Sequence, residues 1–181
     1  MKIRRFKLAP RMREVYAALK RTGVTLTPDI EAMATVADRR LADLLDPAVV
    51  CETADGASAL MAEVKRIQQV PRNVTAVSFV CATLGSAVDA AVRDDDELQR
   101  LILEALLMEY LDAAGRFVYK LLQDQAEADT ELGSMNALPA ELAPAADELL
   151  QPARIGVTRM AGVLSPRFSA MHYVYWFARR K

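Results

Sequence analysis

Few side chains in this sequence could do chemistry, and three short stretches hold most of them. Thr83-Leu84-Gly85-Ser86 follows a strongly apolar run, where backbone N–H groups between a strand and a helix could meet an anion. Asp94-Asp95-Asp96-Glu97 could attract a hard cation, although it lacks the spaced oxygen ligands of a calcium loop. The aromatic run from His172 to Phe177 could stack on a flat ligand. For the first two stretches, a plain turn and a solvated helix start are the favoured interpretations.

The familiar catalytic and metal-binding patterns are absent from the sequence. His172 is its one histidine, which leaves little for a His-based triad or a His-rich metal centre. There is no Cys-x-x-Cys, no glycine-rich phosphate loop and no His-Glu-x-x-His. A lone histidine within an aromatic strand is more often a packed or exposed strand residue than a ligand. We therefore assign no metal site and no catalytic residue.

Composition and charge exclude several classes of protein. The chain of 181 residues is large enough to bury a real core, and we expect a single domain over 1–181. The net charge of -1 gives no global attraction to nucleic acid or to a membrane. Cys51 and Cys81 lie in apolar runs and are expected to be reduced, buried side chains. Without a run of 18 apolar residues or a signal-peptide core, a cytoplasmic protein is expected.

The elements that must position the three stretches are organised around a strand and a long helix. Residues 74–83 are almost wholly apolar or β-branched, which predicts a central strand buried on both faces. After the break at Gly85-Ser86, acidic residues favour the start of a helix from about Asp96 to Asp124. This helix is apolar on most sides, so we expect it to be the most buried one. Gly115 within it costs about 1 kcal/mol relative to Ala, which favours a close contact with a sheet or a ligand.

Shorter patterns predict the elements before this unit. Apolar residues at helical spacing predict a helix over 11–20, and a second helix starts at the hydroxyl cap and proline of Thr27-Pro28-Asp29 and stops at Asp46-Pro47. An edge strand with basic outer positions is expected over 2–8 and a further strand over 48–53. Asp55-Gly56 is typical of a hairpin turn. The segment 58–69 fits a helix, or a strand that leads into a short helix.

The last third of the chain has a different composition. Residues 126–146 are rich in Ala, Pro and Glu, which favours a long surface connection that is mobile or functional, and 144–150 can form one short helix. Residues 168–177 alternate as a strand does. This alternation would send Tyr173, Tyr175 and Phe177 to one face, and His172, Val174 and Trp176 to the other.

Five short motifs also occur in an informative order. They are Arg13-Glu14-Val15-Tyr16-Ala17-Ala18-Leu19 with Thr27-Pro28-Asp29, Asp46-Pro47-Ala48-Val49-Val50, Val80-Cys81-Ala82-Thr83-Leu84-Gly85, Leu111-Asp112-Ala113-Ala114-Gly115, and Ile155-Gly156-Val157 with Ser165-Pro166-Arg167-Phe168-Ser169. Their order and spacing over nearly the full chain resemble the activation (reactivation) domain of vitamin B12-dependent methionine synthase, in its stand-alone bacterial form.

The resemblance implies an α+β fold, with a twisted antiparallel sheet and helices. In that family the domain binds S-adenosylmethionine and presents its methyl group to inactive cob(II)alamin, which is remethylated after one-electron reduction by a flavoprotein. The implied partners are cobalamin-binding methionine synthase modules or another corrinoid protein, so that the cobalamin is carried by the partner. Neither nucleic acid nor a membrane is an expected partner.

One part of the family's pattern is missing. The family's ligand site relies on an Arg-x-x-Pro-Gly-Tyr segment between the central helix and Ile-Gly-Val, and the corresponding interval 131–139 has no arginine, Pro-Gly pair or tyrosine. Acidic residues of the family's central helix are replaced by Arg116 or Lys120. Loss of a charge-assisted pair with the ligand carboxylate typically costs a few kcal/mol. The binding of S-adenosylmethionine is therefore expected to be weak or lost.

A remaining family-like site is expected where three segments converge: the turn at Thr83 and Gly85, the loop with Gly133, Ser134 and Asn136, and the strand with Tyr173 and Tyr175. The two tyrosines would pack the adenine or the corrin edge. Three hypotheses follow. The chain is an activation subunit that supports S-adenosylmethionine-dependent reductive methylation of a corrinoid protein, or a degenerate, non-catalytic relative that docks to such a partner without binding S-adenosylmethionine. An unrelated small-ligand module is the third.

Overall fold

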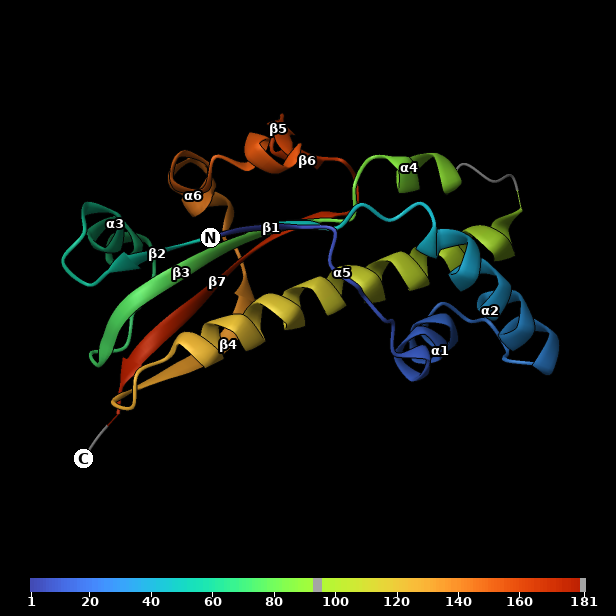
Figure 1. Cartoon of the computed structure of the whole chain (residues 1–181), viewed down its shortest axis with the longest axis horizontal. Coiled ribbons are helices and arrows are strands. Elements are labelled where there is room, and N and C mark those ends of the chain that lie inside the picture. The colour runs from blue at the N-terminus through green and yellow to red at the C-terminus, as the bar shows by residue number, and fades with distance from the viewer. Residues whose placement is uncertain (93–95, 180–181) are drawn as a thin grey trace.

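A five-stranded antiparallel sheet separates two helical layers in this computed structural model, which describes residues 1–92 and 96–179 (Figure 1). The α+β fold with an antiparallel sheet is thereby confirmed. The strands follow one another across the sheet in the order β1 (Lys2–Arg4), β2 (Ala48–Asp55), β3 (Val74–Thr83), β7 (Ser169–Ala178) and β4 (Thr130–Ala137). A separate hairpin joins β5 (Thr158–Met160) to β6 (Val163–Ser165).

The helices divide between the two faces of the sheet, as Figure 1 shows. One face carries α1 (Met12–Arg21), α2 (Pro28–Ala42) and α5 (Glu97–Gln125). The other face carries α3 (Ala59–Ile67), α6 (Ala143–Leu150) and the β5–β6 hairpin, with the short helices η1 (Ala140–Leu142) and η2 (Pro152–Ile155). The short helix α4 (Ala87–Ala91) follows β3, and its Val88 packs in the core under α5. None of the described helices is long and apolar enough to cross a membrane.

The central strand β3 contributes to both hydrophobic cores, as its continuous apolar sequence predicts. Val80 and Ala82 pack in the core under α5, whereas Phe79 and Cys81 pack in the core under α3 and α6. Both cysteines are free and buried, and burial is the main cause that raises the pKa of Cys51 to about 11 and that of Cys81 to about 12. They behave as small apolar side chains.

Helix α5 runs along the sheet and holds more buried residues than any other described helix, which confirms its predicted place. The Asp96 side chain accepts a hydrogen bond from the Gln99 N–H and starts the helix. The close contact predicted at Gly115 is made by β4, because a Cβ added there would lie 3.4 Å from the Met135 sulfur. Met108 is an exception among the apolar side chains of this helix, because it is 54% exposed.

Two predictions about turns and edges are wrong. Asp55-Gly56 does not close a hairpin: the Asp55 and Ser58 side chains accept the backbone N–H groups of Ala57 and Met61, and this capping starts α3. The ambiguous segment after it is therefore a helix. The first strand ends at Arg4 rather than Leu8, because Arg5 takes a left-handed conformation with φ of 55°.

The segment 126–146 is not a long surface connection. Most of it forms β4, an edge strand that pairs with β7, and then η1 and the predicted helix α6. The register shifts between Leu132 and Met135, which breaks the alternation that would otherwise indicate a strand. Both of these side chains pack against the core under α5. The polar remainder of β4 follows from its position at the edge of the sheet.

Candidate functional site

The structure brings five of the seven predicted ligand-binding residues onto neighbouring strands. Asn136 pairs with Tyr173 across β4 and β7, and Gly133 and Ser134 lie in the irregular part of β4 opposite the stretch of β7 that contains Tyr175. A Cβ added to Gly133 would lie 2.6 Å from the Phe177 ring, so only glycine fits there. These residues come from two segments that were expected to meet.

The other two residues, Thr83 and Gly85, lie elsewhere. Thr83 pairs with Ser169 at the far end of β7, about 13 Å along the strand from Tyr173. The Thr83 hydroxyl accepts hydrogen bonds from the Gly85 N–H at 3.2 Å and the Ser169 hydroxyl at 2.9 Å. Gly85 has a φ of 91° and packs against Asp46. Both residues shape a turn, and the three segments do not meet at one place.

The two tyrosines face away from α5. Tyr173 and Tyr175 pack edge to face with ring centroids 5.1 Å apart, in the core under α3 and α6. The Tyr175 hydroxyl donates to Gln68 at 3.0 Å, and burial is the main cause that raises the pKa of Tyr175 to about 12. Val174 and Trp176 pack on the opposite face under α5, so the predicted alternation of the strand is confirmed. Of the seven residues, Ser134 alone lines the groove described next.

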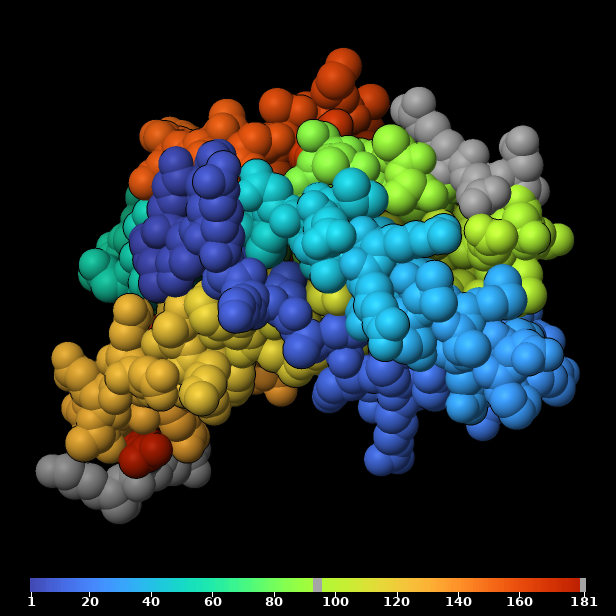
Figure 2. Space-filling model, turned by 45° about the vertical axis from the view of Figure 1, so that its right-hand side comes forward, coloured from blue at the N-terminus to red at the C-terminus, as the bar shows by residue number. Residues whose placement is uncertain are grey.

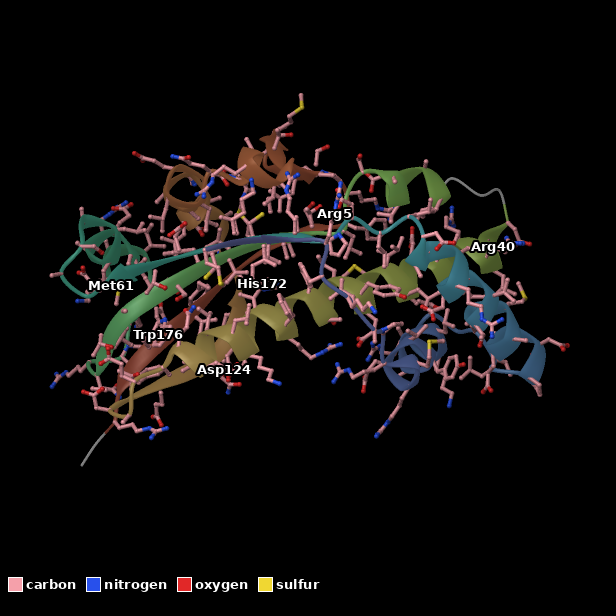
Figure 3. The ribbon with its side chains drawn as sticks, in the orientation of Figure 1. Arg5, Arg40, Met61, Asp124, His172 and Trp176 are labelled. Atoms are coloured by element: carbon pink, nitrogen blue, oxygen red, sulfur yellow. The ribbon has the colours of Figure 1, made fainter. Side chains whose placement is uncertain are left out.

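A polar groove of about 690 Å³ lies between α5 and β4, and we call it the α5–β4 groove. Figure 3 shows His172 between the sheet and α5, with Asp124 near the end of that helix. Tyr119 holds the two walls together, because its hydroxyl donates to the Gly133 carbonyl at 3.0 Å. The α5–β4 groove is lined by Arg11, Asp112, Gly115, Arg116, Tyr119, Lys120, Gln123, Asp124, Ser134, Met135 and His172.

A buried carboxylate organises the cations at one end of this groove. Glu109 is 5% exposed and accepts hydrogen bonds from Arg11 Nε at 3.0 Å, from the Arg11 backbone N–H at 3.2 Å and from Arg116 at 2.6 Å. Burial alone would raise the pKa of Glu109, but the hydrogen bonds from the two arginines outweigh it and hold that pKa below its ordinary value. Glu109 is therefore ionised and fixes both guanidinium groups.

Asp112 and His172 carry the titratable chemistry of the groove. Burial, and then the charge of Glu109, raise the pKa of Asp112, whereas Arg116 and His172 lower it in part. Burial lowers the pKa of His172, against the opposing effects of Asp112 and of a hydrogen bond to the Asn136 backbone. His172 is therefore neutral at pH 7. An anionic Asp112 next to a neutral imidazole can face a cationic or sulfonium group. Lys120, which also lines the groove, makes no ion pair among the described residues.

Sequence reasoning found Asp112 only as part of a motif and gave it no role. The signal that could have found the groove is a polar stripe on an otherwise apolar helix. Glu109, Asp112, Arg116 and Lys120 recur at helical spacing and so share one face of α5. The proximity of Asp112 to His172, 60 residues later in the chain, is a consequence of the sheet and leaves no local mark in the sequence.

The acidic stretch after α4 offers no cation site that can be described. Asp94 and Asp95 lie outside the described residues, as do Arg180 and Lys181. Glu97 is exposed at the start of α5 and Asp96 caps that helix. Within residues 1–92 and 96–179, no group of three or more His, Cys, Asp or Glu side chains is placed to hold a metal ion.

Comparison with solved structures finds the same fold in a domain of known identity. A crystal structure of the MetH reactivation domain bound to AdoHcy overlays on 100% of this chain and 80% of that chain, with a TM-score of 0.59 and 11% sequence identity. At this identity the likeness shows a shared fold, which confirms the fold implied by the sequence resemblance. Protein-family models and curated proteins give no match to the chain.

Proposed function

We propose that this chain is an activation-domain-like protein that binds S-adenosylmethionine in the α5–β4 groove and supports the reductive methylation of a corrinoid protein. One observation carries the proposal. The family's ligand segment corresponds to the interval 131–139, and here that interval forms β4, one wall of a polar groove. The fold around it is shared with a domain bound to AdoHcy, the demethylated form of the same ligand.

The lining of the groove suits a ligand with charges of both signs. The Asp112 carboxylate would face the sulfonium or the amino group, and Arg116 and Lys120 would face the carboxylate. A volume of about 690 Å³ lies within the range of small-molecule sites. Met135 and the face of α5 at Gly115 supply apolar contacts for the adenosyl group.

The affinity should nevertheless be weak. No arginine stands on β4, and Arg116 is already tied to Glu109 at 2.6 Å. Lys120 provides a hydrated point charge where the family has a bidentate arginine, and such a charge is a poorer match to a carboxylate. We therefore expect no tight complex with free S-adenosylmethionine. A partner that closes the groove would raise the affinity, because it would exclude water from these charges.

The cobalamin would be carried by the partner and would supply the methyl acceptor. This chain's own residues would bind the donor, with Asp112 oriented toward the sulfonium and the groove open toward the partner. We propose cobalamin-binding methionine synthase modules or another corrinoid protein as that partner. The absence of a family arginine also keeps the alternative function open, in which the chain docks to such a partner without binding S-adenosylmethionine.

Calorimetry with S-adenosylmethionine and AdoHcy tests this proposal. S-adenosylmethionine should bind with a dissociation constant above about 10 µM, and more tightly than AdoHcy, because only the former carries a positive sulfur facing Asp112. Asp112→Asn should abolish that preference, and Lys120→Ala should weaken both ligands. Asp43→Asn on α2 and Lys65→Ala on α3 are matched controls outside the groove.

The outcomes separate the two functions. No heat with either ligand, together with capture of a corrinoid protein, would support the docking alternative. A low-micromolar dissociation constant would contradict the expected loss of affinity and would mean that Arg116 leaves Glu109 to take the carboxylate. Binding that neither groove variant changes would place the ligand elsewhere.

A further inference from the structure

Helix α2 presents a second, exposed apolar row beside the one that it buries. Ala34 and Leu41 are buried in the core. Ala32 and Val36 lie one turn apart on the neighbouring exposed side of α2, Arg40 follows one turn later, and Leu44 stands in the turn just after the helix; Val36 is 48% and Leu44 39% exposed. Figure 2 shows α2 on the surface that faces the viewer. Val36 and Leu44 are two of the five large apolar side chains that are exposed among the described residues.

A groove follows this row. It has a volume of about 640 Å³ and lies between α2 and the first turns of α5, and we call it the α2–α5 groove. Ile102 and Leu103 of α5 and Ala91 form its far wall. From α2 and the turn after it, the groove is lined by Asp29, Ala32, Met33, Val36, Ala37, Arg40, Leu41 and Leu44. On α2 this lining runs from Asp29 to Leu41, about 18 Å of helix, which matches a second helix better than a compact small molecule.

Two opposite charges stand in this lining without a partner. Asp29 lies in the first turn of α2 and Arg40 in the last, about three turns or ~16 Å apart. Neither makes an ion pair or a side-chain hydrogen bond with the rest of the described chain. Figure 3 places Arg40 at the end of α2 that approaches α5. A ligand for this groove would therefore carry a base and an acid at the same separation.

We propose that the occupant of the α2–α5 groove is the α2 helix of a second copy of this chain, packed antiparallel about a twofold axis. In an antiparallel pair in which Asp29 meets Arg40 of the second copy, Ala32 meets Ala37 and Met33 meets Val36. All six residues line the groove, so the lining pairs with itself. A twofold interface requires this property, because each contact must occur twice.

The packing of the two copies follows from the shapes of these side chains. Met33 and Val36 lie nearest the axis, and the small Ala32 and Ala37 flank them and leave room for their side chains. In each copy, the exposed row of α2 lies beside the α2–α5 groove of that same copy. The twofold axis therefore places the row of one copy in the groove of the other. Two Asp29–Arg40 pairs then flank an apolar centre, which is the usual arrangement of a protein interface.

Sedimentation equilibrium with charge-reversed variants tests the proposal. The wild-type chain should be a dimer at about 100 µM. Asp29→Arg and Arg40→Asp should each raise the dissociation constant about tenfold or more, because two attractions become two repulsions. An equimolar mixture of these two variants should form a heterodimer about as tightly as the wild type. In that heterodimer both contacts between positions 29 and 40 join a guanidinium of one variant to a carboxylate of the other.

Matched reversals on the same helix give the control. Glu31→Arg and Arg39→Asp change the same charges in the same first and last turns, but outside the groove lining, and should leave dimerisation unchanged. Thermal melting should show all four variants folded. A wild-type monomer at the stated concentration, equal effects of the control reversals, or no association in the mixture of folded variants would each overturn the proposal.

Discussion

Helix α5 borders two grooves of nearly equal size whose walls are built from different residue types. The α2–α5 groove has about 640 Å³ and is walled mainly by aliphatic side chains such as Val36 and Ile102. The α5–β4 groove has about 690 Å³ and is walled by Asp112, Lys120 and their charged neighbours. Size alone would not assign a different role to each. The residues of the walls do, because a row of aliphatic side chains along a helix suits the apolar face of another helix, whereas opposed charges suit a ligand with charges of both signs.

The difference arises from what packs against each half of the helix. The first half meets α2, another helix with an apolar stripe, so that apolar side chains meet across the groove. The second half meets an edge strand, which reaches α5 with Leu132 and Met135 and leaves the polar face of the helix open. A predominantly apolar helix can therefore keep a charged face where its neighbour is a short, irregular strand.

Shortening a buried side chain of α5 between the two grooves should have the largest effect on stability. Leu106 is fully buried in the core that both halves share. Leu106→Ala should lower the free energy of unfolding by roughly 2–5 kcal/mol, through lost burial and a residual cavity. Denaturant titration measures this, with Met108→Ala, 54% exposed on the same helix, as the control expected to cost less than about 1 kcal/mol. A loss of that smaller size at Leu106 would show that α5 is peripheral.

Removing the charge of Glu109, at one end of the α5–β4 groove, should have the next largest effect on stability. Glu109→Gln keeps the shape but removes the anion shared by Arg11 and Arg116, which should cost about 1–3 kcal/mol at neutral pH. Because the folded pKa of Glu109 lies below its unfolded value, its stabilisation is present above the unfolded value, near 4.5, and is lost as pH falls through the folded pKa. Glu109→Gln should therefore lack this loss of stability at acid pH.

Glu63→Gln is the control, because that carboxylate pairs with Arg66 on the exposed surface of α3. It should leave the unfolding midpoint nearly unchanged at neutral pH. If the two variants behave alike, the Glu109 cluster has no structural role in the polar groove. Its arginines would then be free for a ligand.

The two grooves differ in how much of them the sequence predicts. Strand β3, helix α5 and strand β7 follow from strong apolar patterns, and the structure has them within a residue or two of the expected bounds. Strand β4 was missed, because the bulge after Leu132 breaks its alternation and its outer edge is solvated. The wall of the polar groove was missed with it.

The candidate site shows the same division in physical terms. Tyr173 and Asn136 were expected together, and the pairing of β4 with β7 places them together. Thr83 and Gly85 were expected in the same site, but the length of β7 separates them from it, and no local pattern encodes how far apart two strand ends will lie. The approach of His172 to Asp112 is likewise set by the packing of α5 on the sheet.

Acid should change the polar groove and leave the apolar one unchanged. Burial lowers the pKa of His172 from its ordinary 6.5, so the unfolded chain takes up a proton first as pH falls, and stability declines from about 6.5 toward the folded value. The change should be less than about 1 kcal/mol between roughly pH 7.5 and 5.5, and smaller in His172→Gln. Denaturant midpoints at both pH values measure it.

The pKa of Asp112 is raised instead, so its effect on the free energy of unfolding has the opposite sign. That effect occurs at lower pH, near the ordinary pKa of 3.8. Dimerisation through α2 should not follow the His172 transition, because His172 does not line the α2–α5 groove. A dimer that dissociates over this range would show that the two grooves are coupled through α5.

The smallest expected effect separates the grooves most cleanly. Gly115 lies in the interior of α5 and lines the polar groove, and an added methyl would lie 3.4 Å from the Met135 sulfur, an ordinary contact with a flexible side chain. Gly115→Ala should therefore raise the free energy of unfolding, by at most about 1 kcal/mol, through better helix propensity. The same methyl narrows the groove, so affinity for S-adenosylmethionine should fall while stability rises. Loss of binding with a gain in stability cannot come from misfolding. Val36→Asp is the converse variant: it should break the dimer and leave ligand binding intact. If Gly115→Ala binds the ligand as the wild type does, the ligand does not reach Gly115, and the α5–β4 groove loses its proposed role.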